Sequence, residues 1–166
     1  GAGGVDAVVI ATPAVSHVEL ACRALGHGLH VMVEKPLALD VASAERVVAA
    51  ATQAGTAAMV GHLMLYNPVV EHLRRLITGG ELGRTYYLSS VRVNLGKLRR
   101  DENALWSFAP HDISVILLLL GALPEWASTA GQHYLQHQVA DVTMTCLGFP
   151  GKARAHIFVS WLHPFK

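Results

Sequence analysis

The sequence predicts an α/β region over residues 1–61, followed by an α+β domain over residues 62–166. In the first region, short apolar runs of strand length alternate with segments of helical periodicity. That order builds half of a doubly wound parallel sheet with right-handed crossovers. In the second region, a long apolar helix precedes three strand-like runs at hairpin spacing. These runs predict an open, mainly antiparallel sheet with one solvated face.

The first region is organised around its second predicted strand. The apolar residues 31–33 lead directly into Glu34, Lys35 and Pro36. Such a run between glycine-containing turns is typical of a buried parallel strand, and open α/β sheets bind ligands at the carboxyl ends of their strands. Pro36 biases Lys35 toward an extended backbone, which holds the lysine in place. On this hexapeptide alone, a lysine that meets a substrate or cofactor and a solvated lysine remain alternatives.

Two further strands and two helices complete the first region. The predicted order is a strand over residues 5–10, a helix capped by Ser16 that ends at residue 26 or 28, the strand 30–33, a helix capped by Asp40 that ends near Gly55, and a strand over residues 56–60. The glycines within residues 1–4 precede a strand and do not follow one. They therefore predict a turn and not a nucleotide-binding loop.

The second region begins where the pattern changes, after Gly61. The predicted order is a helix capped by Asn67 over residues 68–78, a strand over 84–94, a polar and basic loop over 96–103, an apolar helix opened by Pro110 that ends at Gly121, and strands over 125–133, 139–147 and 153–161. Trp106 is predicted to lie in the core.

The composition is that of a globular chain. Of its 166 residues, 52% are apolar and 15% are charged, which excludes a disordered chain. A formal net charge of +1 gives no electrostatic reason to expect nucleic acid or an anionic membrane as a partner. The most apolar run, residues 113–123, is too short to span a bilayer, and the first residues lack the pattern of a signal peptide. We therefore expect a cytoplasmic protein.

The cysteines and histidines give no metal site. Cys22 and Cys146 are far apart in apolar surroundings, which predicts two reduced, buried thiols. His133 and His137 have a spacing that metal sites use, but in strand-like sequence this spacing places the rings far apart. We expect no metal.

The motifs taken together resemble the Gfo/Idh/MocA family of nicotinamide-dependent sugar oxidoreductases. The matching pieces, in order, are Ala11-Thr12-Pro13 with His17, Glu34-Lys35-Pro36, Gly61-His62 with Tyr66-Asn67-Pro68, Gly80-Glu81-Leu82-Gly83, Asn94-Leu95-Gly96, Leu105-Trp106 and Ala109-Pro110-His111-Asp112-Ile113-Ser114. The last three resemble the branch that oxidises the 3-hydroxyl of UDP-N-acetylated sugars. The resemblance implies a partial Rossmann-like domain followed by a domain whose open sheet often mediates oligomerisation, so we expect a homo-oligomer.

The resemblance also implies roles for particular residues. Lys35 and His111 match the catalytic lysine and the histidine proposed as general base. The positions expected to line NAD or NADP are Thr12, Pro13, His17, Glu34, Lys35 and Pro36. The positions expected to bind a sugar or nucleotide-sugar substrate are Tyr66, Asn67, Arg92, Asn94, Ser107 and His111. For Arg92 and the basic loop residues Lys97, Arg99 and Arg100, contact with a diphosphate and simple solvation remain alternatives.

These residue types suit the oxidation of a secondary alcohol, and the resemblance implies C3 of a nucleotide-linked N-acetyl sugar as its position. Such a reaction removes a proton from oxygen while a hydride leaves carbon for the nicotinamide. An unperturbed imidazole, with a pKa of about 6.5, can accept that proton at neutral pH. A lysine beside the hydroxyl favours the negative charge that develops on oxygen.

The sequence departs from the family pattern in two places. The glycine-rich turn that follows the first strand of the family's sheet is absent, as though the chain began at the fourth strand, so we expect weak NAD or NADP binding. Ser107 stands four residues before His111, where the family usually has an aspartate. Both departures favour the alternative of a non-catalytic or truncated homologue that keeps the fold and its self-association surface.

Overall fold

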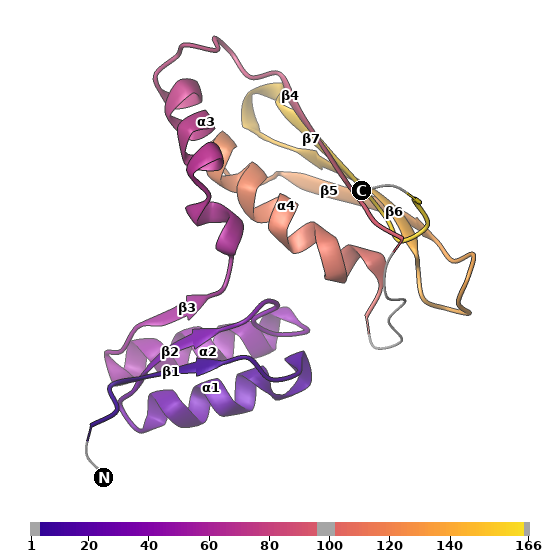
Figure 1. The fold of residues 1–166 in the computed structure, drawn as a ribbon. Helices are drawn as coiled ribbons and strands as arrows, with labels where there is room; N and C mark the ends of the chain where they lie inside the picture. Colours follow the sequence, from indigo (N-terminus) through magenta and orange to yellow (C-terminus); the bar gives the residue numbers. More distant parts are fainter. Residues whose placement is uncertain (1–3, 96–101, 165–166) are drawn as a thin grey trace. The chain divides into compact units, whose positions relative to one another are not determined.

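The computed structural model describes residues 4–95 and 102–164 (Figure 1). The chain divides into two compact units, Gly1–His62 and Leu63–Lys166. The first contains a parallel sheet and the second a mixed sheet, so the predicted fold class is confirmed.

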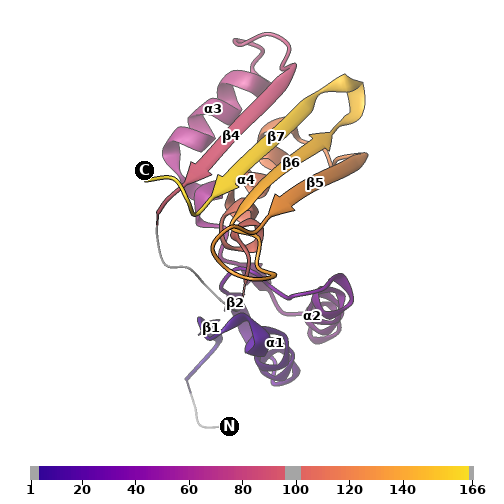
Figure 2. The ribbon, with the colours of Figure 1, turned by 90° about the vertical axis from the view of Figure 1, so that its right-hand side faces the viewer.

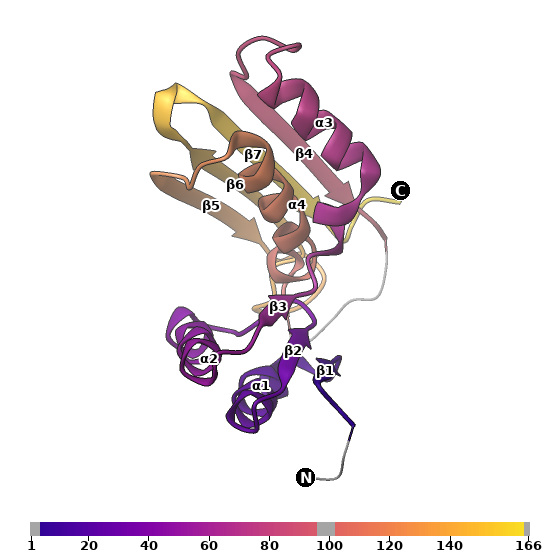
Figure 3. The ribbon, with the colours of Figure 1, turned by 90° about the vertical axis from the view of Figure 1, so that its left-hand side faces the viewer.

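The first unit is a three-stranded parallel sheet with two helices. The strands are β1 (Ala7–Ile10), β2 (His30–Val33) and β3 (Ala58–Val60), hydrogen-bonded in the order β1-β2-β3. The short 3-10 helix η1 (Ala14–Ser16) leads into α1 (His17–Gly26), and α2 is Val41–Ala54. Both helices lie on the same side of the sheet (Figure 3). They bury one apolar cluster with it, formed by Ile10, Ala21, Leu25, Val31, Val33, Val47 and Ala51.

The other face of this sheet carries a row of apolar side chains. Val9, Met32 and Met59 are in register across the three strands. Val9 is 70% exposed, as expected for a strand at the edge of the sheet. Ile10, the next residue along β1, faces the helices and is 6% exposed, because alternate strand residues point to opposite sides of the sheet.

The helix caps of the first unit agree with the sequence at Asp40 and differ at Ser16. The Ser43 amide donates to Asp40 Oδ1 over 2.8 Å at the start of α2, and this bond lowers the pKa of Asp40. Gly55 ends α2 with a φ of 63°, in the left-handed region that glycine favours. Ser16 precedes α1 but does not cap it, since its hydroxyl donates to the Pro13 carbonyl over 2.8 Å.

The second unit is a four-stranded mixed sheet with two helices. Its elements in order are η2 (Leu63–Tyr66), α3 (Pro68–Thr78), β4 (Tyr87–Val93), α4 (Ala104–Leu120), β5 (Trp126–Gln132), β6 (Val142–Gly148), η3 (Pro150–Lys152) and β7 (Arg154–Ser160). The strand order is β4-β7-β6-β5. The pairs β5/β6 and β6/β7 are antiparallel, as predicted, while β4 joins β7 in parallel.

The long helix α4 starts earlier than the sequence predicts. It begins at Ala104, and the Trp106 amide donates to Asn103 Oδ1 over 3.0 Å, so Asn103 is the cap. Pro110 therefore lies inside the helix and does not open it. The prediction was wrong because proline is favoured in the first helical turn, which hid the asparagine cap upstream. The earlier start also leaves Trp106 43% exposed, so its predicted place in the core is wrong.

Helices α3 and α4 cover one face of the mixed sheet, and the opposite face is open (Figures 2 and 3). The covered face and α4 form the core of the unit, which includes Ile116, Ile157, Val159 and the fully buried Trp161. Large apolar side chains are exposed on the strands of the sheet, at Tyr87, Val91, Trp126 and Met144.

Candidate functional site

Three polar segments follow the three parallel strands of the first unit. The strand ends are joined by backbone bonds: the Glu34 amide donates to the Ile10 carbonyl over 2.9 Å, and the Gly61 amide to the Val33 carbonyl over 2.8 Å. The segments that begin at Thr12, Lys35 and His62 therefore leave the sheet at one edge. This carboxyl edge is where open α/β sheets bind ligands.

The turn after β1 is held by short-range bonds. The hydroxyl groups of Thr12 and Ser16 lie 2.7 Å apart, and the Ser16 amide donates to the Pro13 carbonyl over 3.0 Å. Thr12 and Pro13 are exposed. The turn thus presents its surface to solvent on a fixed backbone.

His17 is buried beneath this turn. Its Nε2 lies 2.7 Å from the Thr12 carbonyl oxygen, and its Nδ1 lies 2.8 Å from the Pro36 carbonyl oxygen. The side chain is 1% exposed. Both ring nitrogens therefore contact backbone of the first unit, and the ring links the segment after β1 to the segment after β2.

The segment after β2 places a carboxylate beside Lys35. The Lys35 amide donates to Glu34 Oε2 over 3.3 Å, and the peptide bond between Lys35 and Pro36 is cis. A Cβ on Gly61 would come within 3.2 Å of the same carboxylate oxygen. Gly61 therefore leaves the space that the Glu34 side chain occupies. Glu34, Lys35 and Pro36 are all half-buried.

His62, at the end of the third segment, was absent from the site predicted from sequence. Burial lowers its pKa, because desolvation disfavours the charged ring. Its Nδ1 is buried and has no hydrogen-bond partner within the described ranges. In the sequence, His62 appeared only as part of the family motif Gly61-His62.

In the second unit, Ser107 and His111 lie one helical turn apart on α4. Ser107 is buried and His111 is half-buried. Asp112, the next residue, is 7% exposed and had no role in the sequence-based site.

Asp112 forms a two-point ion pair with Arg92 of β4. Arg92 Nε donates to Oδ2 over 2.8 Å and Nη2 donates to Oδ1 over 3.0 Å. Ser90 Oγ also donates to Oδ1, over 2.8 Å. The hydrogen bond with Asp112 raises the pKa of Arg92. This guanidinium, predicted to bind substrate, thus has a carboxylate partner within its own unit.

A cavity of about 210 Å³ adjoins this pair. Apolar side chains of η2, α3, β4 and α4 form most of its wall, with Arg92, Asp112, Ser89 and Ser90 as its polar members. A pocket with a few convergent polar groups in an apolar wall can hold a small organic group.

The other predicted substrate residues have varied surroundings. Tyr66 is exposed, and Asn67 Oδ1 accepts from the Val69 amide over 2.9 Å, so Asn67 caps α3 as predicted. Asn94, just past β4, donates its amide to the Ser160 carbonyl over 3.0 Å. Lys97, Arg99 and Arg100 lie outside the described residues.

Two other predictions from the sequence concern a metal site and a membrane-spanning helix. The rings of His133 and His137 are 6.0 Å apart, closer than predicted because both lie in the turn after β5 and not in a strand. Within residues 4–95 and 102–164, no group of three metal-binding side chains forms. No described helix is long and apolar enough to cross a membrane.

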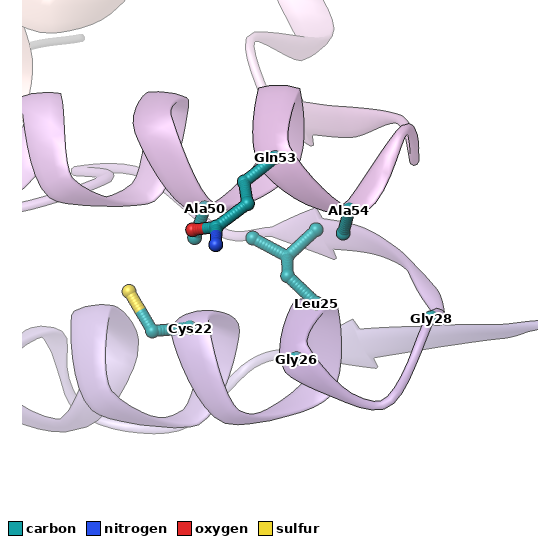
Figure 4. A pocket seen from close by; sticks show the side chains of 7 residues that line it. All are labelled: Cys22, Leu25, Gly26, Gly28, Ala50, Gln53 and Ala54. Carbon is teal, nitrogen blue, oxygen red and sulfur yellow. The ribbon is translucent and has the colours of Figure 1, made fainter.

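One cavity of the first unit lies away from the carboxyl edge. It has a volume of about 540 Å³ and lies between α1 and α2. Figure 4 shows Cys22 pointing toward α2 and the Gln53 amide lying across the groove. Gly26, the last residue of α1, and Gly28 in the turn after it also line the cavity, so it opens near the amino end of β2. We assign the candidate site to the opposite edge, where the strands end in polar residues.

Models of two protein families match the chain. Residues 2–62 match the oxidoreductase family with an NAD-binding Rossmann fold, and residues 70–166 match the GFO/IDH/MocA C-terminal domain.

Individual relatives differ in the reaction that they catalyse. The UDP-N-acetylglucosamine 3-dehydrogenase of Acidithiobacillus ferrooxidans is 32% identical over 72% of this chain and 37% of its own length. The 2,7-anhydro-N-acetylneuraminate hydratase of Mediterraneibacter gnavus is 29% identical over 76% of this chain and 36% of its own length. The chain thus spans well under half the length of these two relatives.

The fold is shared with solved structures. The crystal structure of GenD2 from gentamicin A biosynthesis, in complex with NAD, superposes with a TM-score of 0.90 at 24% identity. The match covers 98% of this chain and 50% of that one.

Proposed function

Because the chain belongs to the Gfo/Idh/MocA family of oxidoreductases, we propose that the protein is an NAD(P)-dependent dehydrogenase that oxidises a sugar hydroxyl. The observation that carries this proposal is the carboxyl edge of the first unit. There Thr12, Lys35 and His62 follow three adjacent parallel strands, the position at which this class of sheet binds ligands.

Each catalytic role that we propose follows from the residue's chemistry. The nicotinamide, when bound, accepts the hydride. Lys35 stabilises the negative charge that develops on the substrate oxygen. His111 accepts the hydroxyl proton, because a neutral imidazole is a suitable base near neutral pH.

Thr12, Pro13, Glu34 and Pro36 are the residues that we propose to line the cofactor. The exposure of Thr12 and Pro13, and the partial exposure of Glu34 and Pro36, support this role. Glu34 is held against Gly61 and the Lys35 amide, so its carboxylate has a fixed position. A polar group whose position is set before the ligand arrives costs less to order on binding.

For the substrate, we propose a nucleotide-linked N-acetyl sugar that is oxidised at C3. The similarity to a UDP-N-acetylglucosamine 3-dehydrogenase supports this class. Tyr66, Asn94 and Ser107 are the substrate contacts that we propose from the family motif. Arg92 is the weakest of the proposed contacts, since Asp112 already occupies two of its donors.

Ser107 supports a second candidate, a non-catalytic or truncated homologue that keeps the fold and its self-association surface. Serine at position 107 gives α4 no carboxylate one turn before His111. We propose that, if the protein is active, the Ser107 hydroxyl orients the histidine ring without a charge.

An activity screen separates the two candidates. The protein is incubated with NAD or NADP and with UDP-N-acetylglucosamine, free N-acetylglucosamine or inositol, and reduced cofactor is followed by absorbance. We expect turnover with the UDP sugar. Absence of cofactor reduction with every substrate and both cofactors, in a folded sample, would favour the non-catalytic homologue.

We also propose that the protein self-associates through the open face of the mixed sheet. The exposed Tyr87, Val91 and Met144 support an apolar contact surface. Light scattering should show at least a dimer, and Met144→Lys should reduce its size. Val9→Lys, on the outer face of the parallel sheet, is the matched control, and a change with that variant alone would instead assign the contact to the first unit.

A further inference from the structure

His17 is the one buried histidine in the described part of the chain. It is the first residue of α1, and its ring lies between two backbone segments that are far apart in sequence. One segment follows β1 and contains Thr12, and the other follows β2 and contains Lys35 and Pro36. The ring nitrogens lie 2.7 Å from the Thr12 oxygen and 2.8 Å from the Pro36 oxygen.

The chemistry of the two partners restricts the state of the ring. A carbonyl oxygen is only an acceptor, and a neutral imidazole has only one N–H donor. With a neutral ring, one contact would place a nitrogen lone pair against an oxygen lone pair at hydrogen-bond distance. Both contacts are hydrogen bonds only when both nitrogens carry protons. Both distances also fall in the range of about 2.7–2.9 Å that is typical of donors carrying a positive charge.

Two effects oppose a charged ring at this position. Burial disfavours the charge, and the first turn of α1 presents backbone N–H groups with partial positive charge. Within the described ranges, no ion pair joins the ring to a carboxylate. The charged side chains on the surrounding elements are Glu19 and Arg23 on α1, Glu34 and Lys35 after β2, Asp40 at the cap of α2, and Glu45 and Arg46 on α2. The two carbonyl contacts must therefore hold the proton.

We propose that His17 is a positioning residue whose ring, protonated on both nitrogens, clamps the Thr12 and Pro36 carbonyls and thereby fixes the Lys35 segment. Loss of one proton breaks one of the two bonds. The carbonyl that faces the deprotonated nitrogen is then no longer bound to the ring, so the ring no longer joins the segments after β1 and β2. The structural part stands on the geometry alone, and its kinetic consequence rests on the proposed dehydrogenase activity.

The structural part is tested by NMR on the 166-residue chain with ¹⁵N-labelled histidine. Long-range proton–nitrogen spectra near neutral pH report which ring nitrogens carry protons. We expect both nitrogens of His17 to be protonated. His27 is the matched control on the same helix, since only its Nδ1 contacts a carbonyl, that of Arg23 at 2.8 Å, and the ring is exposed. A neutral ring satisfies a single carbonyl contact, so His27 supplies the reference signature of one protonated and one bare nitrogen.

The His17 signals are identified by their absence in His17→Gln, or by through-bond transfer from the His17 backbone if that variant does not fold. A bare ring nitrogen on His17 near neutral pH, with the amide signals of residues 12 and 36 in their folded positions, would overturn the proposal.

The kinetic part uses the full-length enzyme. A glutamine cannot donate from both ends of its side chain, so His17→Gln should lower kcat/KM by about a hundredfold through misplacement of Lys35. The loss should appear in kcat and not in KM, because Lys35 acts on charge that develops in the transition state, whereas His27→Gln should leave kcat and KM unchanged. A His17→Gln variant with a normal kcat, or one whose loss lies entirely in KM, would refute the positioning role. An inactive wild-type enzyme would refute the proposed function and leave the NMR result standing.

Discussion

The two units fix their polar residues in different ways. At the carboxyl edge of the first unit, side chains are bound to backbone groups: His17 to two carbonyl oxygens, and Glu34 to the Lys35 amide. In the second unit, Arg92, Ser90 and Asp112 bind one another through their side chains. Backbone partners remain when a side chain is replaced, but a buried side-chain partner leaves its counterpart unsatisfied. Substitution of His17 or Glu34 should therefore act mainly on activity, and substitution within the Arg92–Asp112 pair mainly on stability.

The largest expected effect is on turnover. Lys35→Ala and His111→Ala in the full-length enzyme should each lower kcat by at least about a hundredfold, the usual scale for loss of a charge-stabilising or general-base group. Steady-state kinetics on variants with unchanged circular dichroism would measure this. A variant that kept a near-normal rate would lose its place in the mechanism.

The next largest effect is on the stability of the second unit, and the two variants of the Arg92–Asp112 pair should differ in cost. Arg92→Ala leaves the Asp112 carboxylate buried without its cation and should cost about 3 kcal/mol. Asp112→Ala leaves Arg92, whose side chain is 35% exposed and can regain water, and should cost about 1–2 kcal/mol. All three tryptophans lie in this unit, so their fluorescence during urea unfolding reports on it. Equal costs for the two variants would contradict this account of the pair.

The smallest effect concerns His62 and pH. Burial lowers its pKa from 6.5 in the folded state, so the unfolded chain binds more protons as the pH falls through that value. The free energy of unfolding should therefore be constant above about pH 7 and decrease as the solution is acidified toward pH 5. His62→Gln should make this pH dependence of the free energy of unfolding less steep. The change should appear in the unfolding of the first unit, which circular dichroism detects and tryptophan fluorescence does not. An equally steep dependence in the variant would assign the protons to other groups.

Local signals in the sequence predicted much of the fold, and contacts between distant residues account for what was missed. The caps at Asp40 and Asn67 and the apolar strand before Lys35 are local patterns, and each was found. The start of α4 was misplaced because Pro110 is a strong local signal that lies inside the helix. Neither the Arg92–Asp112 pair nor the parallel pairing of β4 with β7 has a local signature.

Contacts between distant residues were also missed at the candidate site. The family motif identified His17 as a residue near the cofactor, but its two backbone contacts join residues 5 and 19 positions away. Only the folded arrangement of the segments after β1 and β2 brings those carbonyls together. Spacing along one strand or helix cannot reveal such a contact.

The central claim, hydride transfer from a sugar carbon to a nicotinamide, can be tested with an isotope label. The full-length protein is incubated with UDP-N-acetylglucosamine deuterated at C3 and with NAD or NADP, and the recovered cofactor is analysed by mass spectrometry. We expect one deuterium in the reduced nicotinamide and a matching ketone at C3 of the sugar. Consumption of the sugar with the deuterium retained in it or lost to water, and none in the cofactor, would exclude hydride transfer from C3 to the nicotinamide.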